Sequence, residues 1–124
     1  QAGAYLSTIT EQLSSALDGL TPTKPGKLVI AYEPIWAIGK SAAEAMTAAD
    51  VREMSIFIKK TLTQYIERAA ALKIPILYGG AVEASNAHAL ITEGDVSGLL
   101  VGHASSEVES FLGIIKAVNT KSNK

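Results

Sequence analysis

The chain has 124 residues, of which 48% are hydrophobic and 19% charged, and its 11 Lys and Arg nearly balance its 12 Asp and Glu. This composition indicates one globular unit over residues 1–124, and a net charge of -1 gives no electrostatic reason to expect nucleic acid or an anionic membrane as partner. The absence of cysteine excludes disulfides and thiolate catalysis, and with no apolar stretch of bilayer length and no signal-peptide pattern we expect a cytoplasmic protein.

The first half of the sequence predicts a helix, a strand and a long loop. The segment 4–20 places apolar side chains at steps of three and four, the pattern of an amphipathic helix that buries Leu6, Ile9, Leu13, Leu17 and Leu20. Two prolines and a glycine in segment 21–26 then end this helix. The continuous apolar run 28–32 is typical of a strand buried on both faces, and a loop follows from Pro34 to about Thr47.

The second half continues the alternation of helices and strands. The longest helix is predicted over 49–72, with Val51, Met54, Ile58, Leu62, Tyr65, Ala69 and Leu72 on one stripe. A strand over 74–78, a short helix over 84–93 and a third strand over 98–102 follow. The last helix, 105–119, is expected to bury Val108, Phe111, Leu112, Ile115 and Val118.

This order of elements, α-β-α-β-α-β-α, predicts an α/β fold with three parallel strands and four helices. Ligands of such sheets bind beyond the carboxyl ends of the strands. Three parallel strands leave both sheet edges open, so we expect either further strands or copies that complete one another. We therefore expect that the chain alone is not a monomer.

The first strand end carries a carboxylate and a short apolar loop. Glu33 directly follows the apolar run, and a carboxylate at the rim of a dry pocket suits a general base. Pro34 and Gly39 bracket the loop, which is stiff in its middle and free to pivot at its ends, as a lid is. An ion pair or a helix cap is the alternative role for Glu33.

The other two strand ends carry glycines. Gly79 and Gly80 follow the second strand, where backbone N–H groups can approach an anion, and Gly102 and His103 lead from the third strand into a helix. Ordinary tight turns are the alternative at both places. His88 and His103 lack the spacing and acidic companions of a metal site, so we expect no metal, and His88 is expected to face solvent.

Three motifs resemble the triosephosphate isomerase family. Residues 31–39, Ala-Tyr-Glu-Pro-Ile-Trp-Ala-Ile-Gly, are similar to that family's sixth strand, catalytic Glu and mobile lid. Residues 76–82 resemble its seventh strand and Tyr-Gly-Gly-Ser turn, and residues 95–102 its eighth strand and phosphate loop. Order and spacing agree over about 4–118. The resemblance implies the C-terminal half of a (β/α)8 TIM barrel and, without a cofactor, the interconversion of dihydroxyacetone phosphate and glyceraldehyde 3-phosphate in glycolysis and gluconeogenesis.

The resemblance also implies roles for individual residues. Glu33 is expected to move the proton between the two substrate carbons, and Tyr78 to help latch the closed lid. The lid is expected to comprise Pro34, Ile35, Trp36, Ala37, Ile38, Gly39, Lys40 and Ser41. The substrate phosphate is expected to be held by backbone N–H groups of Gly39, Gly80, Ala81, Gly102 and His103.

The sequence departs from the family pattern in the lid and in both phosphate turns. Lys40 follows Gly39 at once, as if two residues of the hinge were absent. Ala81 replaces the Ser of the turn, and His103 replaces the second Gly of the phosphate loop. Asp95 is expected to form an exposed ion pair with Lys59, worth at most about 1 kcal/mol.

The family's substrate-binding Lys and electrophilic His cannot be placed on any residue of this sequence. Without them the developing oxyanion has no preorganised partner, so we expect the chain alone to be inactive or very weak. A homo-oligomer or a complementary N-terminal half-barrel is the expected partner, with a triose phosphate as substrate. Two alternatives stay open: a non-catalytic half-barrel that self-associates, and a module that binds phosphate only.

Overall fold

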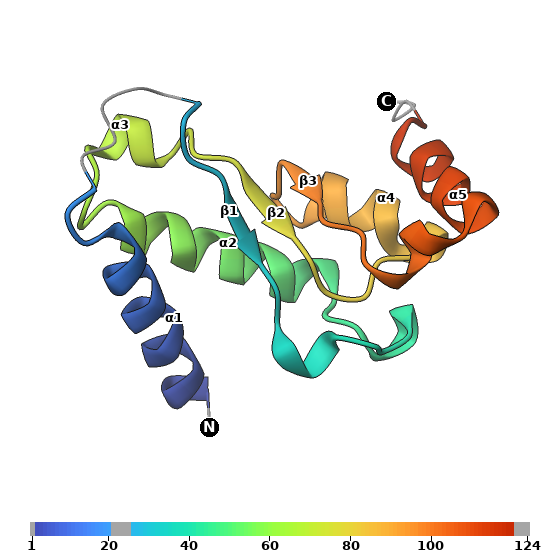
Figure 1. Cartoon of the computed structure of the whole chain (residues 1–124), viewed down its shortest axis with the longest axis horizontal. Helices are drawn as coiled ribbons and strands as arrows, with labels where there is room; N and C mark the ends of the chain where they lie inside the picture. The colour runs from blue at the N-terminus through green and yellow to red at the C-terminus, as the bar shows by residue number, and fades with distance from the viewer. Residues whose placement is uncertain (1, 21–25, 121–124) are drawn as a thin grey trace.

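A computed structural model describes residues 2–20 and 26–120 (Figure 1). Its helices are α1 (Ala2–Leu17), α2 (Ala48–Leu62), α3 (Arg68–Ala71), α4 (Ala84–Glu93) and α5 (Val108–Val118), and its strands are β1 (Ile30–Tyr32), β2 (Ile76–Tyr78) and β3 (Gly98–Leu99). Three short 3-10 helices, η1 (Ile35–Ala37), η2 (Ala42–Glu44) and η3 (His103–Ser106), follow β1 and β3. The predicted helix-ending segment lies outside the described residues except for Gly26.

The three strands form one parallel sheet in the order β1-β2-β3, as the alternation predicted. Tyr32 pairs with Tyr78, and Tyr78 with Leu99. The ladder continues past the strand ends, since the Gly79 N–H donates to the Tyr32 carbonyl and the Leu100 N–H to the Tyr78 carbonyl, both at 2.8 Å. The residues that follow each strand are therefore held along one edge of the sheet.

Helices cover one face of this sheet, with α2 and α4 lying behind the strands in Figure 1 and α1 to the lower left of β1. Strand side chains alternate between faces, so Tyr32, Ile76 and Tyr78 are buried against the helices while Ala31 and Leu77 point the other way. Ala31 is exposed and Leu77 only half-buried. The prediction of strands buried on both faces is wrong for β1, because no described element covers this second face.

The core lies between the sheet and the helices. The predicted stripes are confirmed in large part for α1, α2 and α4, whose buried apolar residues are Ile9, Leu13, Leu17, Val51, Met54, Ile58, Leu62, Ala87 and Leu90. Leu20 is an exception, because α1 ends at Leu17 and leaves it 56% exposed. Burial of these side chains, at about 25 cal/mol per Å² of apolar surface, holds the helices on the sheet.

The single helix predicted over 49–72 is two helices in the structure. α2 ends at Leu62, and α3 begins only after Glu67, whose carboxylate accepts the N–H groups of Ala69 and Ala70 at 3.0 Å each. These bonds stabilise a new helix start and lower the pKa of Glu67. The break turns Tyr65, Ala69 and Leu72 away from the core, so their predicted places on the buried stripe are wrong.

The last helix is shorter than predicted, and a different side of it faces the core. α5 starts at Val108, after η3, and packs on α4 through Ile114, which is 3% exposed. The side chains predicted to face inward are instead exposed, between 36% and 75% of their surface: Val108, Phe111, Leu112, Ile115 and Val118. The helix is apolar on more than one side, so periodicity alone did not identify the side that meets α4.

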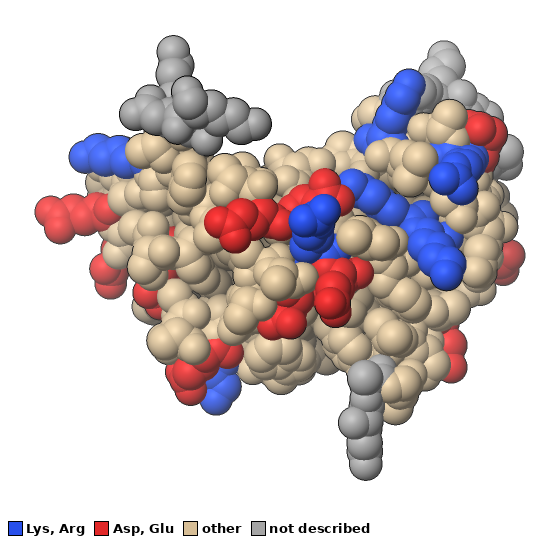
Figure 2. Space-filling model, turned by 180° about the vertical axis from the view of Figure 1, so that it is seen from behind, with Lys and Arg blue, Asp and Glu red and all other residues tan. Residues whose placement is uncertain are grey.

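Charged side chains are spread over the helical side of the molecule (Figure 2). Lys and Arg gather towards the end where α2 finishes, and its last turn carries Lys59 and Lys60. Cations there complement the negative end of the helix dipole. Among the described residues, no helix combines the length and hydrophobicity that crossing a bilayer requires.

Candidate active site

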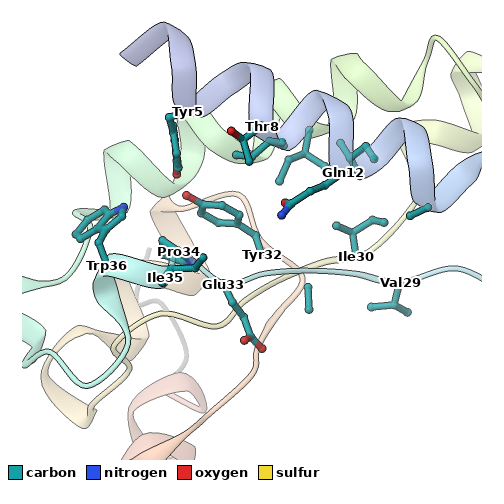
Figure 3. Close-up of a pocket in the computed structure, with 15 residues that line it drawn as sticks. Tyr5, Thr8, Gln12, Val29, Ile30, Tyr32, Glu33, Pro34, Ile35 and Trp36 are labelled. Atoms are coloured by element: carbon teal, nitrogen blue, oxygen red, sulfur yellow. The ribbon is translucent and has the colours of Figure 1, made fainter. Parts of the chain in front are cut away.

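Glu33 is placed by the strand that precedes it. Because successive strand residues point to opposite faces, Glu33 leaves the sheet on the side opposite Tyr32, and Figure 3 shows its carboxylate pointing away from Tyr32 and α1. The side chain is exposed. The expected dry rim is therefore absent, because this is the face of the sheet that no described element covers.

The backbone of the glycine turn after β2 lies close to the Glu33 side chain. An ideal Cβ on Gly79 would lie 2.5 Å from Cγ of Glu33 and 3.3 Å from its Oε1. Only a residue without a side chain leaves this space free. The glycine turn expected to approach an anion thus also provides clearance for the candidate base.

The residues of the predicted lid form η1 and a turn. Pro34 and Ala37 are buried, whereas Ile35, Trp36 and Ile38 are 83%, 51% and 59% exposed. Gly39 has φ 74°, a left-handed conformation that L side chains rarely adopt. The predicted lid therefore has an exposed apolar tip, followed by Gly39 in a backbone conformation that favours glycine.

Two glutamates accept hydrogen bonds from the C-terminal end of the predicted lid. Glu44 Oε2 accepts the Ser41 N–H at 3.3 Å and the Ser41 hydroxyl at 3.0 Å, which lowers the pKa of Glu44, with a smaller contribution from Lys40. Oε1 of Glu83 accepts the Ala42 N–H at 3.1 Å. Sequence reasoning missed both glutamates. The S-x-x-E spacing from Ser41 to Glu44 is a capping-box signal that could have identified the first.

Tyr78 is fully buried at the end of β2, and its hydroxyl has no hydrogen-bond partner among the described residues. Its ring folds back over Gly80, so that a Cβ there would collide with the phenol. Burial raises the pKa of Tyr78, although the nearby Met46 backbone N–H, outside hydrogen-bonding geometry, offsets part of the rise. A buried donor without a partner among the described residues destabilises the fold.

The predicted phosphate turns lie along the same sheet edge. Ala81 is buried, and its carbonyl accepts a hydrogen bond from Asn86 Nδ2 at 2.9 Å. Gly102 is exposed and its carbonyl accepts the Ser105 N–H at 2.9 Å. His103 is exposed and lines a hollow of about 460 Å³ between η3 and the start of α4. The strand register brings both turns to the edge that carries Glu33.

A separate cavity of about 500 Å³ lies on the helical side, between α1 and β1 (Figure 3). The hydroxyls of Tyr5 and Tyr32 point toward one another there, and neither has a hydrogen-bond partner within residues 2–20 and 26–120. Burial raises the pKa of Tyr5, with a further contribution from Tyr78. Although Glu33 borders this cavity, its carboxylate points away from it, so the cavity is distinct from the candidate active site.

The remaining polar candidates have structural partners. His88 is half-buried, and its Nδ1 lies 3.2 Å from the Ala117 carbonyl and 3.1 Å from the Thr120 hydroxyl, so the prediction that it faces solvent is wrong. The predicted pair of Lys59 and Asp95 is confirmed at 3.3 Å. Within residues 2–20 and 26–120, no three His, Asp or Glu side chains are arranged to bind a metal ion.

Comparisons with known proteins agree on one family. The sequence model described as triosephosphate isomerase matches residues 1–118. Among curated triosephosphate isomerases, that of Roseiflexus sp. (strain RS-1) is 40% identical over 92% of this chain and 44% of its own length. Those of Chlamydia muridarum (strain MoPn / Nigg) and Moorella thermoacetica (strain ATCC 39073 / JCM 9320) are each 42% identical, over 95% and 93% of this chain and 42% and 45% of their own lengths. The chain thus spans less than half the length of these relatives.

Proposed function

Because the chain belongs to the triosephosphate isomerase family, we propose that it forms the C-terminal half of an aldose-ketose isomerase acting on triose phosphates. The proposed reaction interconverts dihydroxyacetone phosphate and glyceraldehyde 3-phosphate. Roles in glycolysis and gluconeogenesis, and a cytoplasmic location, are parts of the same proposal.

One observation carries this proposal above the others: Glu33 extends over the Gly79 backbone at the edge where all three strands end. A carboxylate held over a glycine turn can reach a substrate that the turn itself binds. An ion pair or helix cap, the alternative role, is not supported, since no hydrogen bond or ion pair to another described residue is formed by Glu33.

We assign the chemistry to the chain's own residues in three steps. The N–H groups of the turns at 80–81 and 102–103, with that of Gly39, bind the substrate phosphate. Glu33 removes a proton from one substrate carbon and returns it to the next, so the carboxyl group ends as it began. The hydroxyl proton of the substrate moves to the former carbonyl oxygen, a transfer that we assign to the complement. The lid closes its exposed apolar tip over the site, where the free Tyr78 hydroxyl meets it and water is excluded.

The same proposal makes the chain dependent on a complement. Oxyanion stabilisation is usually the largest catalytic contribution, and the family's electrophilic His has no counterpart in this sequence. A complementary N-terminal half-barrel would supply the missing groups and cover the second face of the sheet.

A non-catalytic half-barrel that self-associates is the second candidate. The observation that favours it is the exposed apolar side of α5, where Val108 is 75% exposed. Apolar surface of this kind marks contacts between proteins. A module that binds phosphate only is a third reading and would keep the turns without needing Glu33.

Complementation tests these candidates. The chain is assayed for isomerase activity alone and with the N-terminal half of the Moorella thermoacetica relative, both made in a host without its own isomerase. Activity is expected only in the mixture, and Glu33→Gln is expected to lower it by at least about 10²-fold, since proton transfer at carbon is the step removed.

Glu11→Gln, an exposed carboxylate on α1, is the matched control for expression and for contaminating enzyme. Equal activity in Glu33→Gln and in this control would contradict the catalytic assignment. A mixture that forms a complex without activity would favour the self-associating half-barrel. Phosphate binding by the inactive chain alone would favour the third reading.

A further inference from the structure

A hydrogen bond links the end of the lid to the helix that follows β2. The Ala42 N–H, in the first turn of η2, donates to Oε1 of Glu83 at 3.1 Å. The two residues are 41 positions apart in the chain, so this bond is a tertiary contact. It fixes the point at which the lid rejoins the rest of the fold.

The backbone of Glu83 is hydrogen-bonded beside the predicted phosphate turn. It is the N-cap residue of α4 in extended conformation, and its own N–H donates to Oδ1 of Asn86 at 2.8 Å. The amide of Asn86 also donates to the carbonyl of Ala81 at 2.9 Å. A short polar chain thus runs from the lid end, through Glu83 and Asn86, to the turn at Ala81.

Bonds within η2 stiffen the same end of the lid. Ser41 and Glu44 form a capping box, and Lys40 lies 3.9 Å from Glu44. By contrast, Gly39 has φ 74° and no heavy atom within 4 Å of an ideal Cβ, leaving open space around it. The end fixed by Glu44 and Glu83 therefore begins at Ser41. The nearest preceding residue with open space around it is Gly39.

We propose that Glu83 is a positioning residue that fixes the C-terminal end of the lid against the phosphate turn, so that lid movement is confined to the segment from Pro34 to Gly39. Its part in catalysis rests on the proposed function, because an isomerase needs the lid. The contact and its effect on lid motion do not require that function. Glu83 acts through Ala42 and touches no reacting atom.

Amide hydrogen exchange of Ala42 tests the contact directly in the full chain. Glu83→Ala is expected to raise the exchange rate of Ala42 about threefold or more, because the amide loses a charge-assisted bond. Glu83→Gln is expected to retain part of the protection, since its amide oxygen still accepts. Glu107→Ala is the matched control, because Glu107 is the N-cap residue of α5.

Trp36, the single tryptophan, reports on the lid itself. Acrylamide quenching of Trp36 is expected to change in Glu83→Ala and to stay at the original value in Glu107→Ala. An unchanged Ala42 exchange rate, or an equal rise in both alanine variants, would overturn the proposal. Faster Ala42 exchange with unchanged Trp36 quenching would also overturn it, because the contact would then not restrain the lid.

Activity of the complemented enzyme separates the two proposals. If Glu83 positions the lid, Glu83→Ala raises KM by a larger factor than it lowers kcat, and Glu83→Gln restores part of the loss. If complementation gives no activity while Ala42 and Trp36 respond to Glu83→Ala, the proposed function fails and the anchoring role stands.

Discussion

Glu33 and Gly79 fit each other across neighbouring strands, with the Glu33 side chain in the space that a Gly79 side chain would fill. The ladder bond from the Gly79 N–H to the Tyr32 carbonyl, at 2.8 Å, fixes the two backbones at this separation. The position of the candidate base therefore depends on a glycine that carries no chemistry.

Replacing that glycine should misplace Glu33. In Gly79→Ala the new methyl group collides with Cγ of Glu33, and a displacement of about 1 Å at a reacting group can cost about 10²-fold in rate. We expect that loss in kcat/KM of the complemented enzyme. Gly3→Ala on α1, where nothing lies within 4 Å, is the control and should keep full activity. Equal activity of the two variants would contradict the clearance role.

The left-handed turn at Gly39 should tolerate asparagine better than alanine. Gly39→Ala places a side chain at φ 74°, which costs about 1 kcal/mol, while asparagine adopts this conformation more easily. Nothing lies within 4 Å of the new Cβ, so the effect is one of backbone conformation alone. Trp36 emission and quenching should change in Gly39→Ala and much less in Gly39→Asn. The reverse order would refute this explanation.

The backbone conformation of Asp95 should contribute more to the stability of the fold than the charge of its side chain does. Its φ is 52°, its carbonyl accepts the Ser55 hydroxyl at 2.8 Å, and its pair with Lys59 is partly exposed. Asp95→Asn and Lys59→Met should each lower the free energy of unfolding by about 0.5 kcal/mol or less. Asp95→Ala should lower it by about 1 kcal/mol more, because alanine disfavours the left-handed region. Urea unfolding at low and high salt measures both contributions.

Tyr78 should make the fold sensitive to alkali. Its pKa is raised by burial in the folded state, so the folded chain keeps the phenol proton to higher pH than the unfolded chain does. The stability from this group is complete below pH 10, the ordinary pKa, and is lost as pH rises through the raised value. Tyr78→Phe should remove part of that alkaline loss.

The same substitution tests the proposed latch. Because the buried Tyr78 hydroxyl has no partner among the described residues, Tyr78→Phe should keep or raise the stability at neutral pH. Lower activity of the complemented enzyme, without lower stability, would support contact with the closed lid. Tyr32→Phe, which removes another buried and unpartnered hydroxyl, is the control and should retain activity.

The exposed side of α5 should drive association of the chain on its own. We expect light scattering to report particles larger than one chain, because Val108, Leu112 and Ile115 leave apolar surface in water. Leu112→Lys with Ile115→Lys should reduce association while circular dichroism keeps the same helix content. A stable monomer of the unaltered chain would contradict this expectation.

Local patterns predicted the elements well, and tertiary contacts decided where prediction failed. Periodicity found α4 at 84–93, and the apolar runs found the three strands, although each is shorter than its run. The break after Leu62 escaped prediction because no glycine or proline marks it and the carboxylate of Glu67 caps a new helix. The buried side of α5 depends on contact with α4, which sequence spacing does not encode.

The candidate site shows the same contrast between local patterns and tertiary contacts. The positions of Glu33 and the glycine turns after the strands follow from chain order, because parallel strands end at one edge. The exposure of Glu33 does not, since it depends on what covers the second face of the sheet. Glu83 carried no motif, and only the fold brings it to Ala42.

Because the second face of the sheet is open, folding of the chain is thermodynamically linked to the binding of any molecule that covers this face. Val29 and Leu100 are 52% and 42% exposed, and a molecule that covers this face binds the folded chain and not the unfolded one. Mass action then adds about 2.7 kcal/mol of stability when the free partner is at 100 times its Kd. The melting temperature of the chain should therefore rise with the concentration of any molecule that binds this face, such as the proposed complement.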